Sequence, residues 1–145
     1  MRQAGFTILE LLVVLVIGAI AYSLVLGVPF RGPSTADLKA ASRALASGLR
    51  QAQSMALATR RDATLTLDLE TREYEVSGTE GTRSLPKGLE LKLFTSQSEV
   101  SSERKGSIRF YPDGSSTGGR ITVAAGERKY LVDVDWLTGR VSIGD

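Results

Sequence analysis

The side chains that most often carry catalysis are scarce in this sequence. Its 145 residues include no histidine, no cysteine and no asparagine. Imidazole bases, Ser-His-Asp triads, thiolate nucleophiles and zinc sites that contain histidine are therefore excluded. Ser102 and Lys105 match a Ser-x-x-Lys pattern, but they lie in a polar stretch, and the asparagine-containing partner motif of such enzymes is missing. The residue types argue against an enzyme.

Two aspartates and a glycine-rich stretch are the remaining candidates for a ligand site. Asp133 and Asp135 stand two apart in a predicted strand, so they share a face and could hold a cation. Trp136 beside them favours an ordinary exposed strand face instead. The stretch 114–119 is rich in glycine but lacks the Gly-Lys-Ser/Thr ending of a phosphate-binding loop. We therefore expect no metal, no cofactor and no catalytic residue.

The most informative charge is Glu10, which lies just before an apolar run. No charged residue occurs from Leu11 to Val28, and a helix of that length spans about 27 Å, close to the hydrocarbon thickness of a bilayer. A carboxylate at its edge is costly without a partner. The length of the run predicts a single membrane-spanning helix over 6–30 that ends near Pro29. Arg2 in the leader 1–5 favours a cytoplasmic N-terminus.

The first thirty residues are also compatible with a cleaved secretory signal or with a plain anchor. A secretory signal could end at Ala19-Ile20-Ala21, which would leave Tyr22 as the first residue of a secreted protein. The apolar run continues to Val28, however, and Glu10 adds a negative charge where such signals favour positive ones. A plain anchor fits the length better, with Glu10 as a residue that faces lipid headgroups.

The pattern Gly5-Phe6-Thr7-Ile8 followed by Glu10 resembles the prepilin signal of type IV pilins and type II secretion pseudopilins. The resemblance implies that a prepilin peptidase cuts between Gly5 and Phe6 on the cytoplasmic side, and that the Phe6 amino group is then methylated. It also implies that Glu10 acts in assembly. A buried carboxylate needs a partner, and the α-amino group of a neighbouring subunit's Phe6 is a suitable one.

The rest of the chain predicts an α+β domain over 31–145. Ser34 or Thr35 could cap a helix over about 35–59. Its apolar positions recur at helical spacing: Leu38, Ala41, Leu45, Leu49, Ala52 and Ala56. About seven strands follow, with segments at 63–69, 73–76, 89–93, 107–111, 121–124, 129–135 and 140–143. We expect an antiparallel sheet laid against the helix. Residues 95–106 are expected to form a polar loop available to partners, and 115–119 a flexible loop.

The segment from Gly106 to Ile121, GSIRFYPDGSSTGGRI, resembles the C-terminal signature of H-type minor pseudopilins of type II secretion. Leu49 to Ala56 is similar to the helix that leads into the first strand of that family. The resemblance implies a pilin-like fold in the periplasm and a place near the tip of the pseudopilus. It also implies partners: the I, J and K types of minor pseudopilin, the major pseudopilin, the prepilin peptidase and the inner membrane.

One alternative is that the chain is a subunit of a type IV pilus and not of the type II secretion pseudopilus. A minor type IV pilin, FimT-like, could serve pilus assembly or DNA uptake. Four basic residues motivate the DNA hypothesis: Arg120, Arg128, Lys129 and Arg140. The formal net charge of the whole chain is only +2, and there is no cysteine for the C-terminal disulfide that related DNA-uptake pilins often carry. We therefore expect no nucleic acid among the partners.

Overall fold

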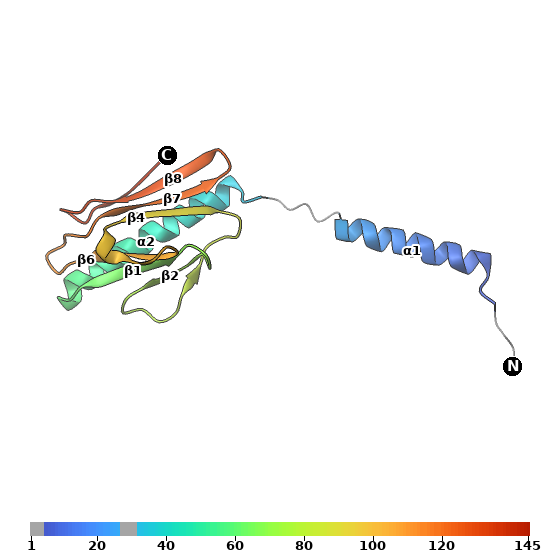
Figure 1. Cartoon of the computed structure of the whole chain (residues 1–145), viewed down its shortest axis with the longest axis horizontal. Helices are drawn as coiled ribbons and strands as arrows, with labels where there is room; N and C mark the ends of the chain where they lie inside the picture. The colour runs from blue at the N-terminus through green and yellow to red at the C-terminus, as the bar shows by residue number, and fades with distance from the viewer. Residues whose placement is uncertain (1–4, 27–31) are drawn as a thin grey trace. The chain divides into compact units, whose positions relative to one another are not determined.

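The computed structural model describes residues 5–26 and 32–145 (Figure 1). Residues 1–4 of the leader, including Arg2, and the expected helix stop at Pro29 lie outside the described residues. The chain divides into two compact units, Met1–Arg31 and Gly32–Asp145.

The first unit contains one helix, α1 (Ile8–Leu26). Thr7 sets its start, because the Thr7 hydroxyl accepts a hydrogen bond of 3.2 Å from the Glu10 backbone N–H and the Thr7 carbonyl accepts one of 3.1 Å from Leu11. Among residues 5–26 and 32–145, no helix combines the length and the apolar content that crossing a membrane requires.

The second unit begins with helix α2 (Thr35–Thr59), and Ser34 is its N-cap. The Ser34 hydroxyl accepts a 3.1 Å hydrogen bond from the Asp37 backbone N–H, while the Asp37 carboxylate accepts one of 2.9 Å from the Ser34 backbone N–H. This reciprocal pair forms a capping box. It lowers the pKa of Asp37, chiefly through the hydrogen bond from the Ser34 backbone. Arg60 closes the helix in the left-handed conformation, with φ 53°.

The apolar stripe predicted along α2 is buried, which confirms the helical period as the core signal. Its six members are Leu38, Ala41, Leu45, Leu49, Ala52 and Ala56. Gly48 adds a close approach to the sheet. A Cβ at Gly48 would lie 2.9 Å from Leu65 Cδ1 and 3.0 Å from Tyr74 Cε2. Small residues on this face therefore let the strands pack directly on the helix backbone.

Five strands form the first sheet in the order β3-β2-β1-β6-β5, with every neighbouring pair antiparallel. Their bounds are β1 (Ala63–Asp68), β2 (Glu73–Val76), β3 (Arg83–Ser84), β5 (Val100–Ser102) and β6 (Lys105–Phe110). Strand β1 alternates buried and half-buried residues, as its period-two pattern predicts.

Four strands form the second sheet in the order β4-β7-β8-β9, again antiparallel. These are β4 (Glu90–Thr95), β7 (Gly119–Ala125), β8 (Arg128–Val134) and β9 (Val141–Gly144). Both sheets pack on α2. In Figure 1, β7 and β8 lie on one side of α2 and β1 and β2 on the other.

One core joins the helix and the two sheets. Its fully buried side chains come from all three parts, including Leu45 of α2, Ile108 and Phe110 of β6, Ile121 of β7 and Val132 of β8. The prediction of an α+β fold with antiparallel strands on a helix is confirmed. The structure refines it, because the strands divide into two sheets rather than one.

The polar stretch 95–106 departs from the prediction of a plain loop. It contains a short 3-10 helix, η1 (Gln97–Glu99), and strand β5, which pairs with β6 at the edge of the first sheet. Strand β3 is also absent from the prediction. Both strands are two or three residues long and lack an apolar alternation, so pairing with a neighbour, and not their own composition, makes them strands.

Candidate assembly site

Gly5 and Phe6, the predicted cleavage pair, lie ahead of α1 in backbone without regular secondary structure. Phe6 is 82% exposed. Among the described residues other than Gly5 and its chain neighbours, no heavy atom lies within 4 Å of the position that a Cβ on Gly5 would occupy. A peptidase could therefore reach the bond between Gly5 and Phe6 without disturbing any packed part of the described chain.

Glu10 lies in the first turn of α1, where it is exposed. Its carboxylate belongs to none of the ion pairs within the described residues. The partial positive charge at a helix N-terminus favours a carboxylate at this position. A carboxylate on an otherwise apolar helix becomes costly only where lipid or neighbouring helices displace its water.

Apart from Glu10 and Ser23, the described surface of α1 is formed by apolar and aromatic residues and by Gly18. From Ile8 to Tyr22, its large apolar residues are at least half exposed, from 50% at Val13 to 82% at Ile8. A helix that is apolar all round is normally buried against other helices or in lipid. The exposed surface of α1 is therefore a candidate contact surface for partners outside the chain.

The segment from Tyr111 to Gly118 connects the two sheets, since β6 belongs to the first sheet and β7 to the second. It is ordered by hydrogen bonds, contrary to the expectation of a flexible loop. The Ser116 hydroxyl donates to the Arg109 carbonyl at 2.7 Å, and the Ser116 backbone N–H donates to the Trp136 carbonyl at 2.8 Å. Ser116 thus joins β6 to the end of β8.

A charged cluster that the sequence analysis missed holds the stretch before β6. Glu99 of η1 is only 8% exposed, and its carboxylate accepts two hydrogen bonds, of 2.9 and 3.3 Å, from the Arg109 guanidinium. Asp62 lies 3.6 Å from the same guanidinium. The hydrogen bond to Glu99 raises the pKa of Arg109. Glu99 and Arg109 are ten positions apart in the sequence, and no local pattern marks them as partners.

The two aspartates considered as cation ligands have separate roles. Asp133 of β8 pairs with Arg120 of β7. Asp135 lies after the end of β8, where its carboxylate accepts hydrogen bonds from Leu137 and Thr138 and closes a turn. These hydrogen bonds lower the pKa of Asp135, chiefly through the Thr138 backbone N–H. The expectation that the pair shares one strand face is therefore wrong, because the strand ends between them.

The fold defines the class of protein. The domain resembles the minor pseudopilin EpsH from the type 2 secretion system of Vibrio cholerae, with a TM-score of 0.59, 13% identity and coverage of 74% of this chain and 95% of that one. It also resembles the type IV minor pilin FimU of Pseudomonas aeruginosa, with a TM-score of 0.56, 16% identity and coverage of 74% and 88%. The fold is that of the pilin-like proteins, as predicted.

Sequence similarity then identifies the family. The family model of the type II transport protein GspH matches residues 41–139, and that of the prokaryotic N-terminal methylation motif matches residues 1–26. A type II secretion system protein H of Xanthomonas campestris pv. campestris is 33% identical over 140 residues, which cover 97% of this chain and 82% of that protein. The chain belongs to the GspH family. The prediction of a minor pseudopilin of type II secretion is confirmed.

Proposed function

We propose that this chain is a structural subunit of the pseudopilus, cut between Gly5 and Phe6, methylated on Phe6 and assembled through Glu10. Before assembly it is held in the bacterial inner membrane by a single helix within 6–30, with the N-terminus in the cytoplasm and the domain 31–145 in the periplasm. It acts by packing and not by catalysis. It stands near the tip, beside the I, J and K types of minor pseudopilin, above the major pseudopilin.

One observation carries the proposal. An exposed, irregular Gly5-Phe6 pair precedes a helix capped by Thr7, whose only carboxylate, Glu10, makes no ion pair within the described residues. The uncharged run in the sequence continues to Val28 and supports a bilayer anchor. Cleavage would create an α-amino group at Phe6. In a helical bundle, such a group on one subunit is the cation that Glu10 of another subunit needs.

The test combines the mass of the N-terminus with assembly of a Glu10 variant. Mass spectrometry of the full chain from cells that contain the prepilin peptidase should find Phe6 as the first residue, with one added methyl group. The Glu10→Ala variant should be processed in the same way, since Glu10 lies beyond the cut. Cross-linking of that variant to other pseudopilins, and secretion itself, should both fall strongly because the charge partner is gone.

The Glu10→Asp variant is the matched control, because it keeps the charge on a shorter side chain and should retain part of the cross-linking. Wild-type assembly and secretion by Glu10→Ala would remove the pairing role. Tyr22 as the mature N-terminus would instead identify a cleaved secretory signal and would reject the anchor altogether.

A further inference from the structure

The second sheet ends in an open edge at β9. Among the described strands that end a sheet, β3 and β5 are two and three residues long, and β5 pairs with a register shift. Strand β4 is longer, but it contacts β6, and the Thr95 hydroxyl donates a 2.8 Å hydrogen bond to the Ser107 carbonyl there. Strand β9 pairs with β8 on one side and with no described strand on the other. An unpaired edge of this kind is a template for another strand.

The hydrogen-bond pattern shows which backbone groups of β9 point outward. The Asp135 backbone N–H donates a 3.0 Å hydrogen bond to the Arg140 carbonyl. Hydrogen-bonded pairs of an antiparallel ladder recur at every second residue. The backbone groups of residues 142 and 144 therefore face β8, and those of Val141 and Ile143 face away from it. The Arg50 guanidinium agrees with this phase, because it donates a 3.3 Å hydrogen bond to the Val141 carbonyl.

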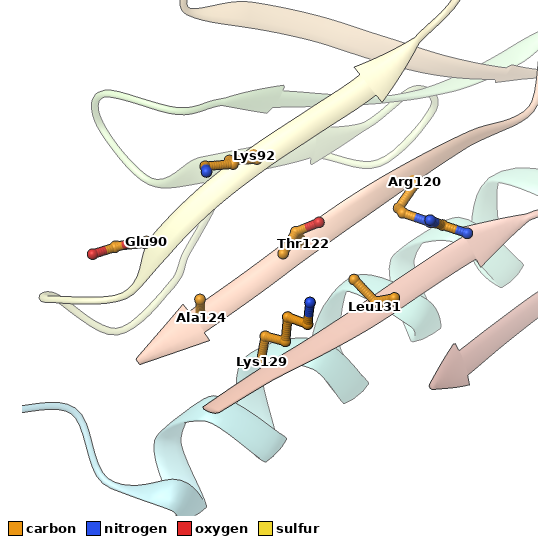
Figure 2. Close-up of a pocket in the computed structure, with 7 residues that line it drawn as sticks. All are labelled: Glu90, Lys92, Arg120, Thr122, Ala124, Lys129 and Leu131. Carbon is orange, nitrogen blue, oxygen red and sulfur yellow. The ribbon is translucent and has the colours of Figure 1, made fainter. Parts of the chain in front are cut away.

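The apolar side chains of β9 face α2. In Figure 2, Leu131 of β8 lies on the face of the second sheet turned away from α2, and Leu131 is paired with Gly144. Successive residues alternate between the two faces, so Ile143 points toward α2, as does Val132 opposite it. Val132 is fully buried, whereas Ile143 is 38% exposed. The apolar inner face of the sheet is therefore incompletely covered at Ile143.

A row of basic side chains on α2 borders this edge. Arg50 reaches Val141, and Lys39 and Arg43 precede Arg50 by eleven and seven positions. At about 100° per residue, the three lie within about 40° of one another around the helix axis. All three are exposed and take part in no ion pair within the described residues. No acidic residue occurs in the sequence from 38 to 61, so this flank of α2 is positively charged.

The open edge and the basic row together specify an extended acidic segment. An added strand carries N–H and C=O groups at every second residue, as the edge of β9 does, with a repeat of about 7 Å. Residues paired directly across two strands share a face. The incoming residue opposite Ile143 would therefore point toward α2 and, if apolar, would cover Ile143. Residues two positions away point to the same face, where carboxylates would meet the basic row. An incoming N–H would also replace Arg50 at the Val141 carbonyl and release Arg50 for such a carboxylate.

We propose that β9 accepts an added strand from a partner protein, in which one face carries an apolar residue flanked by acidic residues, in the order acidic-x-apolar-x-acidic. A second copy of this chain fits less well, because antiparallel pairing of β9 with β9 would bring two basic rows to the same side of the joined sheet. Nucleic acid also fits less well, because the outward carbonyl oxygens of Val141 and Ile143 repel phosphates. The proposal goes beyond assembly through Glu10 and depends neither on Glu10 nor on processing.

The charge test uses the full chain in neutral detergent micelles and a fluorescent peptide, Ala-Glu-Thr-Val-Thr-Glu-Ala. Anisotropy should show binding that weakens with added salt. The Arg43→Glu/Arg50→Glu variant should bind this peptide about tenfold less tightly, since two exposed charge contacts are reversed. It should gain binding of the peptide in which Lys replaces both Glu residues. The Arg83→Glu/Lys87→Glu variant has the same charge change at exposed positions elsewhere and should bind as wild type.

A backbone test separates strand pairing from charge attraction alone. Ile143→Pro removes an outward N–H and leaves the hydrogen bonds to β8 in place, so it should weaken binding about tenfold. Ile143→Ala keeps the N–H and should lose less. A peptide N-methylated at alternate residues keeps N–H groups along one edge only. Of the two alternately methylated peptides, one should bind like the parent peptide and the other should not. These peptides decide the question with the wild-type chain even if Ile143→Pro does not fold.

Four results would overturn the proposal. They are no binding of the acidic peptide to wild type, equal losses in the two charge variants, equal binding of the two methylated peptides, and tighter binding of duplex DNA or of a second copy at the same edge. Competition with the acidic peptide identifies the last case. Failure of processing or of Glu10-dependent cross-linking would reject the assembly mechanism but would leave these peptide measurements unaffected. The two proposals therefore fail separately.

Discussion

At the scale of single residues, the pair formed by Glu99 and Arg109 decides how the stretch before β6 is held. The Glu99 side chain is 7% exposed and that of Arg109 is 35% exposed. A nearly buried carboxylate is tolerated because two hydrogen bonds from one guanidinium compensate the loss of water. This pair therefore fastens the stretch for which the sequence predicts a loop.

Replacing Glu99 by Gln should lower the free energy of unfolding by about 1–3 kcal/mol, because Arg109 loses its bidentate partner but keeps part of its hydration. Denaturant unfolding of the full chain in micelles measures the change. Glu70→Gln is the matched control. Its pair with Arg104 is 2.6 Å long, but both side chains are more than 60% exposed, so its loss should cost less than about 0.5 kcal/mol. Equal effects would show that the burial of Glu99 is irrelevant.

At the scale of secondary structure, α2 is the element on which both sheets pack. Its capping box makes the stability of its first turn depend on pH. Hydrogen bonds from Ser34 lower the pKa of Asp37 in the folded state. The ionised Asp37 carboxylate therefore contributes its full stabilisation of the fold above the pKa that Asp37 has in the unfolded chain. This stabilisation is lost as the pH falls through the lower, folded pKa.

The Asp37→Asn variant should show a smaller loss of stability than wild type when the pH is lowered from about 5 to 2. Ser34→Ala should be less stable at every pH, since the Asp37 backbone N–H loses its acceptor. The stability of Ser34→Ala should still fall with decreasing pH nearly as steeply as that of wild type, because the main hydrogen bond to Asp37 comes from the Ser34 backbone. Thermal unfolding across this pH range measures both variants. Identical slopes for Asp37→Asn and wild type would reject the assignment.

At the scale of the domain, the junction of the two sheets depends on Gly119. Its φ of 153° is unfavourable for a side chain, and a Cβ there would lie 2.7 Å from the Phe94 carbonyl oxygen and 3.1 Å from Ile108 Cδ1. Phe94 belongs to β4 and Ile108 to β6, so the contact involves a strand of each sheet. Backbone cannot move away as a flexible side chain could.

Gly119→Ala should therefore destabilise the domain by about 2–4 kcal/mol. Gly126→Ala is the control for the cost of a positive φ without a clash. Gly126 has φ 62°, and apart from its chain neighbours no described heavy atom lies within 4 Å of the position that its Cβ would take. This control substitution should cost about 1 kcal/mol. Chemical denaturation of the two variants measures both losses, and equal losses would mean that the approach of the sheets at Gly119 does not matter.

Local signals were sufficient wherever neighbours in the chain define the feature. The helix 35–59 follows from its 3.6-residue apolar period, and β1 and β2 follow from alternation around a turn. The motif of Gly5, Phe6 and Glu10 is also local, and its roles in cleavage and assembly stay predictions. These features were therefore open to prediction from the sequence.

Only the tertiary structure decided the features that join distant residues. The division into two sheets, the pair of Glu99 with Arg109 and the cross-sheet role of Ser116 all depend on strand order and register. Antiparallel pairing is specified by packing against α2 and by cross-strand neighbours, and many orders satisfy the same alternation. The sequence by itself thus determined which segments are helical or extended and which of their faces are apolar, while the tertiary structure determined which distant polar side chains meet.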